Sequence, residues 1–364
     1  MSRRHATILT STLLLIGMLC AVVLIRVPYS ELSPGPTVNT LGEHGGDPVL
    51  NIKGKKTYPT SGHLNMTTVR VTSADYRMSL AEALYGWLSD ESAVVPHSTL
   101  YPEGKTAEEA EEENAEEFTQ SQQSAKVAAL KELGIPVPTR TVVASVVKNS
   151  PAEGNLRAGD VIKAVDGKPV DKPGDVAELV TRHKPGENVI FTVVPAKAAE
   201  AAEKAGEDPA GAATKRVSIT TTQAKDDKRA IVGIQAGTAH TFPFEIDIKL
   251  ADVGGPSAGL MFALGIVDKL TPTELTAGTF VAGTGTIDAA GTVGPIGGVQ
   301  MKTLAAREAG AKFFLTPEAN CPTAAEQKPE GLTLVKVGTM DGAMKALKDI
   351  RDQKTDDLPV CTTN

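Results

Sequence analysis

The stretch Gly254–Gly265, "GGPSAGLMFALG", sets one small hydroxyl at the start of an apolar segment. The segment continues to Leu270 with apolar side chains around most of a helical circumference, which is typical of a buried helix. Such a helix directs free backbone N–H groups and the positive end of its dipole at whatever lies beside Ser257. Ser257 is therefore either a helix cap or a nucleophile. If it is a nucleophile, the helix end would stabilise the oxyanion of the tetrahedral intermediate that forms.

The residues around Ser257 favour access by a substrate. Gly255 and Gly259 carry no side chain, and Pro256 has no N–H to donate. The candidate oxyanion donors are therefore the N–H groups of Ser257 and of a neighbouring glycine. We expect Gly255 and Gly259 to support the site by letting a substrate backbone approach.

A serine nucleophile needs a base, and the sequence offers two. His240 lies on an expected strand edge and leaves a Ser-His-Asp arrangement open. Lys302 falls in the first turn of an expected helix, where the helix dipole and burial would both lower the pKa of its amine. Moving a lysine pKa from about 10.4 to near 7 costs about 4–5 kcal/mol, so a lysine kept there indicates a functional role. A lysine whose amine reaches water would instead keep its usual pKa. Lys302 is the preferred base.

Composition excludes several classes of function. The chain has 364 residues and a formal net charge of −7, so it lacks the basic surface that nucleic-acid binding requires. The acidic run Glu103–Glu117 is interpreted as a solvated helix face. The histidines and cysteines lack metal-ligand spacing, and no Walker A pattern occurs, so we expect no metal, no cofactor and no ATP.

The amino-terminal segment Ala6–Ile25 contains no charge and follows Arg3 and Arg4. About twenty helical residues span the hydrocarbon core of a bilayer. A cleaved signal peptide would have a shorter apolar region, and the large Leu19 before Cys20 argues against a lipoprotein signal. The arginines then predict a single-pass membrane anchor with an extracytoplasmic body, and a cytoplasmic body is the disfavoured alternative.

Cys321 and Cys361 are the two cysteines of the part expected outside the membrane. An oxidising compartment lets such a pair form a disulfide, which would contribute about 4 kcal/mol and fix the polar carboxyl-terminal tail. Two unrelated free thiols are the alternative.

Residues 141–194 predict strand, turn, strand, helix and strand, and "SPAEGNLRAGDVIKAVDG" at 150–167 resembles bacterial PDZ domains. The resemblance implies a groove beside the strand Thr141–Val147 that accepts an extended peptide by strand addition. The usual Gly-Leu-Gly-Phe carboxylate loop is absent before this strand, where Pro136–Arg140 stands instead. The Ala/Glu-rich segment Ala196–Lys215 is expected to be a solvated excursion between two strands.

Three motifs resemble the proteolytic domain of the Lon family of serine peptidases, family S16. They are "GGPSAG" at 254–259, "TGTIDAAGTVGPIGGVQMK" at 284–302 and "AAREAGAKFFLTPEAN" at 305–320, in that order. The resemblance covers Arg229 to about Gly338. It implies an α/β fold like ribosomal protein S5 domain 2 and, as is common in the family, a homo-hexameric ring.

The resemblance also implies roles for individual residues. Ser257 corresponds to the nucleophile, Lys302 to the general base, and Thr284 to a hydroxyl that holds the lysine amine. Many family members have aspartate two positions before the proline, where this chain has Gly254, with Asp252 nearby. That departure affects what the resemblance implies about the positions of the residues around Ser257, but not the pairing of Ser257 with Lys302.

We expect an α+β fold in five parts. The parts are a cytoplasmic stub and transmembrane helix at 1–28, strands and helices packing on the peptidase domain at 29–136, a PDZ β-sandwich or partly open barrel at 137–225, a Lon-like proteolytic domain at 229–350 and a tail at 351–364. Within 29–136, the pattern predicts a strand at His63–Ser73, a capped helix from Ser79 and a long helix from about Thr106 to Leu133. If this region pairs with the peptidase fold, the PDZ domain is an insertion.

The sequence therefore predicts an ATP-independent serine endopeptidase of the cell envelope, with a PDZ domain that binds substrate or partner peptides. Its substrates would be extended or partly unfolded proteins, or proteins near the membrane that are cut at specific sites. The alternative is a catalytically silent PDZ scaffold at the membrane surface. The joint presence of Ser257, Lys302 and Thr284 favours the enzyme.

Overall fold

The computed structural model describes the chain apart from residues 1–2, 103, 105, 206, 251–252 and 364. It divides into two compact units. The first unit combines Met1–Ile135 with Phe244–Asn364, and the second unit is Pro136–Pro243. Asp252, singled out beside the serine motif, lies outside the described residues.

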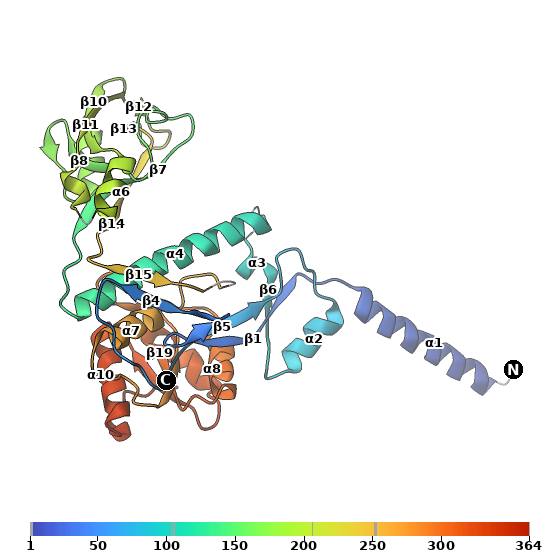
Figure 1. The fold of residues 1–364 in the computed structure, drawn as a ribbon. Helices are drawn as coiled ribbons and strands as arrows, with labels where there is room; N and C mark the ends of the chain where they lie inside the picture. Colours follow the sequence, from blue (N-terminus) through green and yellow to red (C-terminus); the bar gives the residue numbers. More distant parts are fainter. Residues whose placement is uncertain (1–2, 103, 105, 206, 251–252, 364) are drawn as a thin grey trace. The chain divides into compact units, whose positions relative to one another are not determined.

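A mixed six-stranded sheet forms the centre of the first unit (Figure 1). Its strands, in spatial order, are β20 (Thr333–Val337), β19 (Phe313–Pro317), β16 (Phe280–Gly283), β5 (His63–Val71), β1 (Tyr29–Asn39) and β6 (Ala93–Pro96). The four strands from β20 to β5 run parallel, and β1 is antiparallel to both of its neighbours. The parallel strands β16, β19 and β20 are short and mainly apolar, as is usual where helices cover a sheet.

Strand β5 joins the two halves of the first unit. It pairs in parallel with β16, from His63 opposite Phe280 to Met66 opposite Gly283, and its other edge pairs with β1. The Thr67 hydroxyl also donates to the carbonyl oxygen of Gly283 at 3.3 Å. Segments before and after the second unit thus share one sheet, which is the arrangement that the insertion hypothesis requires.

Helix α7 (Gly259–Leu270) confirms the buried helix expected after Ser257. Every residue from Gly259 to Asp268 is buried. The helix contacts β5 and also packs against α4 (Ala107–Glu132), where the rings of Phe118 and Phe262 meet edge to face with centroids 5.9 Å apart. Burial between a sheet and a second helix explains why α7 is apolar around most of its circumference.

The local signals in residues 29–136 are also confirmed. Ser79 caps α2 (Leu80–Leu88) and Thr106 caps α4, each in a capping box with the glutamate three residues later. The strand expected at His63–Ser73 is β5. The other elements of the first unit are α3 (His97–Leu100), α8 (Val299–Glu308), α9 (Cys321–Glu326), α10 (Met340–Arg351), β2 (Glu43–His44), β3 (Asp47–Pro48), β4 (Leu50–Lys53), β15 (Glu245–Ile248), β17 (Thr286–Ile287) and β18 (Val293–Gly294).

Helix α1 (Arg3–Leu24) covers the apolar amino-terminal segment. Its most apolar window has a mean hydropathy of 2.4 and no buried residue. By length and composition it could cross a membrane, and a signal sequence would meet the same criteria.

The second unit is built on a sheet whose strands, in spatial order, are β11 (Lys215–Thr220), β10 (Asn188–Val194), β8 (Val161–Val165), β7 (Thr139–Val146) and β14 (Ile234–His240). Two further short strands are β12 (Thr222–Gln223) and β13 (Ala230–Ile231), and β9 (Lys168–Pro169) pairs with β8. Its helices are α5 (Pro173–Thr181) and α6 (Ala196–Lys204). The Ala/Glu-rich segment lies between β10 and β11 as expected, but its first part is α6, which packs Ala199 against Val161 and Val194 instead of forming a solvated excursion.

Candidate active site

Ser257 and Lys302 lie in contact within the first unit. The Lys302 Nζ donates a hydrogen bond to the Ser257 Oγ at 2.7 Å. Ser257 stands just before α7, whose cap residue is Ala258 with no side-chain capping bond. The serine hydroxyl is therefore turned to the lysine amine and does not cap the helix.

Thr284 completes a closed set of hydrogen bonds. Its hydroxyl accepts from Lys302 Nζ at 3.0 Å and donates to the carbonyl oxygen of Ser257 at 3.0 Å. The Gly285 N–H donates to the same carbonyl at 2.8 Å. The strand end at residues 283–285 thus fixes the serine backbone and the lysine amine together.

The amine of Lys302 is deeply buried. The residue is 2 % exposed, and this burial alone lowers the pKa of its amine from 10.5 to about 8. A buried ammonium is costly when, as among the described residues here, it has no carboxylate partner, so the neutral amine becomes accessible near neutral pH. A neutral amine within hydrogen-bond distance of a hydroxyl can act as a general base.

The start of α8 sets the place of Lys302. Gly298 precedes the helix with φ 66°, and its carbonyl accepts from the Lys302 N–H at 3.1 Å. A Cβ on Gly298 would lie 2.9 Å from the Cγ1 of Val69 on β5. Glycine is required here both by the left-handed backbone and by the close approach of α8 to the sheet.

Helix α4 holds the loop before Ser257 from the outside. The Ser121 hydroxyl donates to the carbonyl oxygen of Pro256 at 2.9 Å, and the Gly255 N–H donates to the carbonyl oxygen of Asn114 at 3.0 Å. Sequence reasoning missed both residues of α4, because nothing local indicates that a residue near position 120 contacts one near 256. The available signal in the sequence was Ser121, a polar residue on the apolar face of the long helix.

The two supporting glycines differ, because a Cβ on Gly255 would meet open space whereas one on Gly259 would meet protein atoms. The N–H of Gly255 is bonded to Asn114, which leaves the N–H of Ser257 as the better oxyanion donor of the two. A Cβ on Gly259 would lie 2.8 Å from the Ser121 Oγ and 3.1 Å from the Ile287 Cγ2. Gly259 therefore permits close packing within the protein, and the expectation that it makes room for substrate is wrong.

His240 belongs to the second unit, on β14. Within the first unit, the Lys302 amine is the basic group that contacts the Ser257 hydroxyl.

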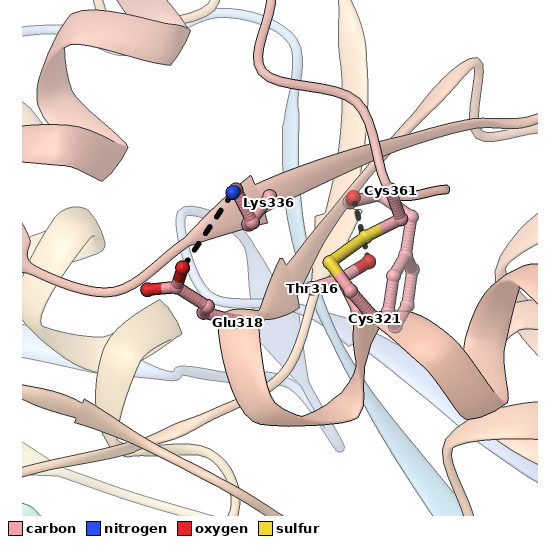
Figure 2. Close-up of a disulfide and its surroundings, with 6 residues drawn as sticks. Thr316, Glu318, Cys321, Lys336 and Cys361 are labelled. Carbon is pink, nitrogen blue, oxygen red and sulfur yellow. Dashed lines mark hydrogen bonds and ion pairs between the residues drawn. A yellow bond between two sulfur atoms is a disulfide. The ribbon is translucent and has the colours of Figure 1, made fainter. Parts of the chain in front are cut away.

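Cys321 and Cys361 form a disulfide that ties the carboxyl-terminal tail to the sheet (Figure 2). The Cys361 N–H donates to the carbonyl oxygen of Leu334 at 2.9 Å. Beside the disulfide, Lys336 and Glu318 form an ion pair at 3.5 Å. Asn320, next to Cys321, exchanges two hydrogen bonds with the backbone of Ile296 and so steadies the loop that leads to α8.

The peptide groove expected beside Thr141–Val147 is misplaced. Strand β7 pairs with β8 on one side and with β14 on the other, so neither edge is free for an added strand. On this side of the sheet the edge strand is β14, and α5 contacts it. The sequence Val232-Gly233-Ile234, apolar residues around a glycine with φ 82°, leads into this edge.

Comparison with known proteins identifies two domains. Residues 113–201 match the PDZ domain model, and residues 250–348 match the model of the Lon protease (S16) C-terminal proteolytic domain. The PDZ match begins within α4, which packs in the first unit, whereas the second compact unit begins at Pro136. The chain therefore carries a PDZ domain and a Lon-type proteolytic domain.

Curated relatives match parts of the chain only. A Lon protease of Lachnoclostridium phytofermentans is 40% identical over 94 residues, which is 25% of this chain and 11% of the relative. A Lon protease of Roseiflexus castenholzii is 45% identical over 76 residues, or 21% of this chain and 9% of the relative. A probable periplasmic serine endoprotease DegP-like of Ectopseudomonas mendocina is 40% identical over 62 residues, which is 17% of this chain and 13% of the relative. The chain spans about a tenth of the length of these relatives.

A solved PDZ domain of an SdrC-like protein from Listeria monocytogenes is 21% identical, with a TM-score of 0.21. That match covers 27% of this chain and 86% of the other.

Proposed function

We propose that this chain is an ATP-independent serine endopeptidase of the cell envelope, with Ser257 as nucleophile and Lys302 as general base. The observation that carries the proposal is the 2.7 Å hydrogen bond from Lys302 Nζ to Ser257 Oγ. Its support is the burial that lowers the pKa of the amine to about 8, together with the Lon-type domain around both residues.

The mechanism follows from these contacts. Neutral Lys302 takes the proton of Ser257 as the serine oxygen bonds to the peptide carbonyl carbon. The Ser257 N–H at the start of α7 stabilises the resulting oxyanion. Protonated Lys302 then gives its proton to the leaving amine. A water molecule, deprotonated by Lys302, attacks the acyl-serine ester, and Lys302 returns that proton to the departing Ser257 oxygen. Thr284 keeps the amine in position through both steps.

The absence of a Walker A pattern from the printed sequence supports cleavage without ATP. An enzyme that does not unfold its substrates acts best on extended or partly unfolded proteins. The apolar α1 and the Cys321–Cys361 disulfide support a membrane-anchored, extracytoplasmic body. Assembly into a homo-hexamer is a further part of the proposal, to be tested by the mass of the detergent-solubilised protein.

The PDZ domain would bind peptides along β14. A peptide added to this edge would lie between β14 and α5, with any terminal carboxylate at the N–H groups around Gly233. Amide chemical shifts that change on peptide addition should therefore concentrate in 232–240. Changes concentrated on β11, at the opposite edge, would contradict this assignment.

The decisive experiment compares the wild type with Ser257→Ala and Lys302→Ala on unfolded casein without ATP. Loss of cleavage in both variants, with unchanged circular dichroism, supports the Ser257–Lys302 pair. Cleavage that survives Lys302→Ala would point to His240 as the base. No cleavage by the wild type would favour the silent scaffold.

A fragment that begins at Arg229 tests the insertion hypothesis. It lacks β5, which pairs with β16, and α4, which packs on α7, so we expect it neither to fold cooperatively nor to cleave casein. A folded, active fragment would contradict the hypothesis.

A further inference from the structure

Helix α2 exposes an apolar face. The exposed large side chains on it are Leu84 at 42%, Tyr85 at 75%, Trp87 at 51% and Leu88 at 87%. At about 100° per residue these four positions share one continuous arc of the helix. A surface helix of a soluble domain shows the opposite pattern, with its polar face outward.

The packing of α2 fixes this face outward. Ala83 and Gly86 on the other side are buried, and a Cβ on Gly86 would lie 2.5 Å from the Cγ2 of Val94 on β6. The capping box of Ser79 and Glu82 holds the start of the helix. The helix cannot roll its apolar face inward without losing both arrangements.

Backbone hydrogen bonds attach the start of α2 to the end of the apolar helix α1. The Leu80 N–H donates to the carbonyl oxygen of Ile25, and the Val27 N–H donates to that of Met78, both at 2.9 Å. The Arg26 guanidinium donates to the carbonyl oxygen of Arg77 at 3.0 Å. The apolar face of α2 therefore begins where α1 ends.

Aromatic residues gather at this junction. Trp87 packs edge to face on Tyr29, just beyond α1, with ring centroids 5.2 Å apart, and Tyr85 lies on the same arc of α2. Tryptophan and tyrosine are enriched at the level of lipid headgroups, where an apolar ring and a polar edge are both satisfied. The exposed side chain of Arg26 lies 4.0 Å from the Glu82 carboxylate on α2, and Asp90 and Glu91 follow this helix in sequence.

We propose that the apolar face of α2 lies in the headgroup region of the bilayer that α1 crosses, as a second membrane contact of the peptidase domain. The inference rests on the proposed anchoring by α1 and goes beyond it. The occupant is lipid because this face is continuous with a helix whose most apolar window contains no buried residue. This contact would fix how the sheet carrying β1 and β6 faces the membrane, since α2 packs on β6.

The single tryptophan of the chain, Trp87, provides the test. The full chain is reconstituted in vesicles of phosphatidylcholine and phosphatidylglycerol, with and without lipids brominated near the headgroup end of the acyl chain. We expect blue-shifted Trp87 emission, at least twofold quenching by the brominated lipids and weak quenching by aqueous iodide. Strong iodide quenching with no effect of bromine would overturn the proposal. Protection from both quenchers would indicate contact with a second copy of the chain and would also overturn it.

Flotation of the vesicles separates this inference from the proposed anchoring. If the protein does not float, the proposed anchoring by α1 is wrong. If it floats but iodide quenches Trp87, only the proposed α2 contact is wrong. The double variant Leu84→Glu, Leu88→Glu should still float but should lose quenching by brominated lipid. Ile190→Glu, which changes an exposed apolar residue of the second unit, is the matched control and should leave Trp87 quenching unchanged. An unchanged bromine effect in the double variant would contradict the proposal.

Discussion

The hydroxyl of Ser121 donates to the carbonyl oxygen of Pro256 at 2.9 Å, so a side chain of α4 holds the residue directly before the candidate nucleophile. Ser121→Ala removes this hydrogen bond, so the loop before Ser257 should shift. Substrate contacts away from Ser257 should stay intact. We expect kcat to fall about tenfold to a hundredfold with little change in KM. Steady-state kinetics on a fluorogenic peptide would measure both.

Ser124→Ala makes the same chemical change on the same helix without that bond and should retain wild-type kinetics. If both variants behave alike, or if Ser121→Ala raises KM alone, Ser121 does not position the nucleophile. Restoration of kcat by Ser121→Cys, which keeps a weak donor of similar size, would support the positioning role.

The pKa of Lys302, lowered by burial to about 8, predicts how activity depends on pH. Only the neutral amine can accept the serine proton, so kcat/KM should rise with pH and reach half its limit near pH 8. An activity that falls as pH rises from 7 to 9 would contradict Lys302 as the base. A rise centred near pH 6.5 would instead indicate a histidine.

Thr284→Val should move this midpoint. The Thr284 hydroxyl accepts from Lys302 Nζ, and a hydrogen bond to the charged form stabilises the ammonium. Its removal should lower the lysine pKa further, so the midpoint of the kcat/KM profile shifts to lower pH while the limiting rate falls because the amine is less well held. A slower enzyme with an unshifted midpoint would mean that Thr284 acts only through the carbonyl of Ser257, to which it also donates.

The parts of this site that follow from local sequence could be predicted, and the parts that depend on distant packing could not. Apolar residues on all sides of α7 indicate burial, and a lysine near a helix start indicates a perturbed amine. The contact between Ser121 and Pro256 joins segments far apart along the chain, so no local pattern carries it. The edge of the PDZ sheet was misplaced for the same reason, because β14 is the last strand of its unit in sequence and covers the edge of β7.

Asp268 on α7 should make the protein less stable as pH rises. Its side chain is fully buried, and burial raises the pKa from 3.8 to about 6 despite a bond from the Leu275 N–H at 2.7 Å. Its Oδ2 has no hydrogen-bond partner among the described residues. The folded state therefore holds this proton more tightly than the unfolded chain does. The free energy of unfolding should fall as pH rises from about 4 to 6, and above pH 6 it should remain about 3 kcal/mol lower than at pH 4.

Asp268→Asn removes this charge and keeps an acceptor for the Leu275 N–H. We expect the variant to unfold at higher denaturant concentration than the wild type at pH 7.5 and at a similar one at pH 4. Asp90→Asn, the same change at an exposed position, should leave the midpoint unchanged. If Asp268→Asn is less stable than the wild type at pH 7.5, the ionised carboxylate is paired in the folded state and does not destabilise it.

The disulfide between Cys321 and Cys361 should stabilise the first unit, since it closes a loop with a sequence separation of 40. In the chain-entropy model a crosslink of this span contributes about 4 kcal/mol by restricting the unfolded chain. The double variant Cys321→Ser, Cys361→Ser should therefore unfold at lower denaturant concentration and lose the sensitivity to reductant that the wild type shows. Cys20→Ser, at an exposed free cysteine, should keep that sensitivity. If reductant leaves the wild-type transition unchanged, the tail is held by the Cys361–Leu334 backbone hydrogen bond and its neighbours, and the crosslink adds nothing measurable.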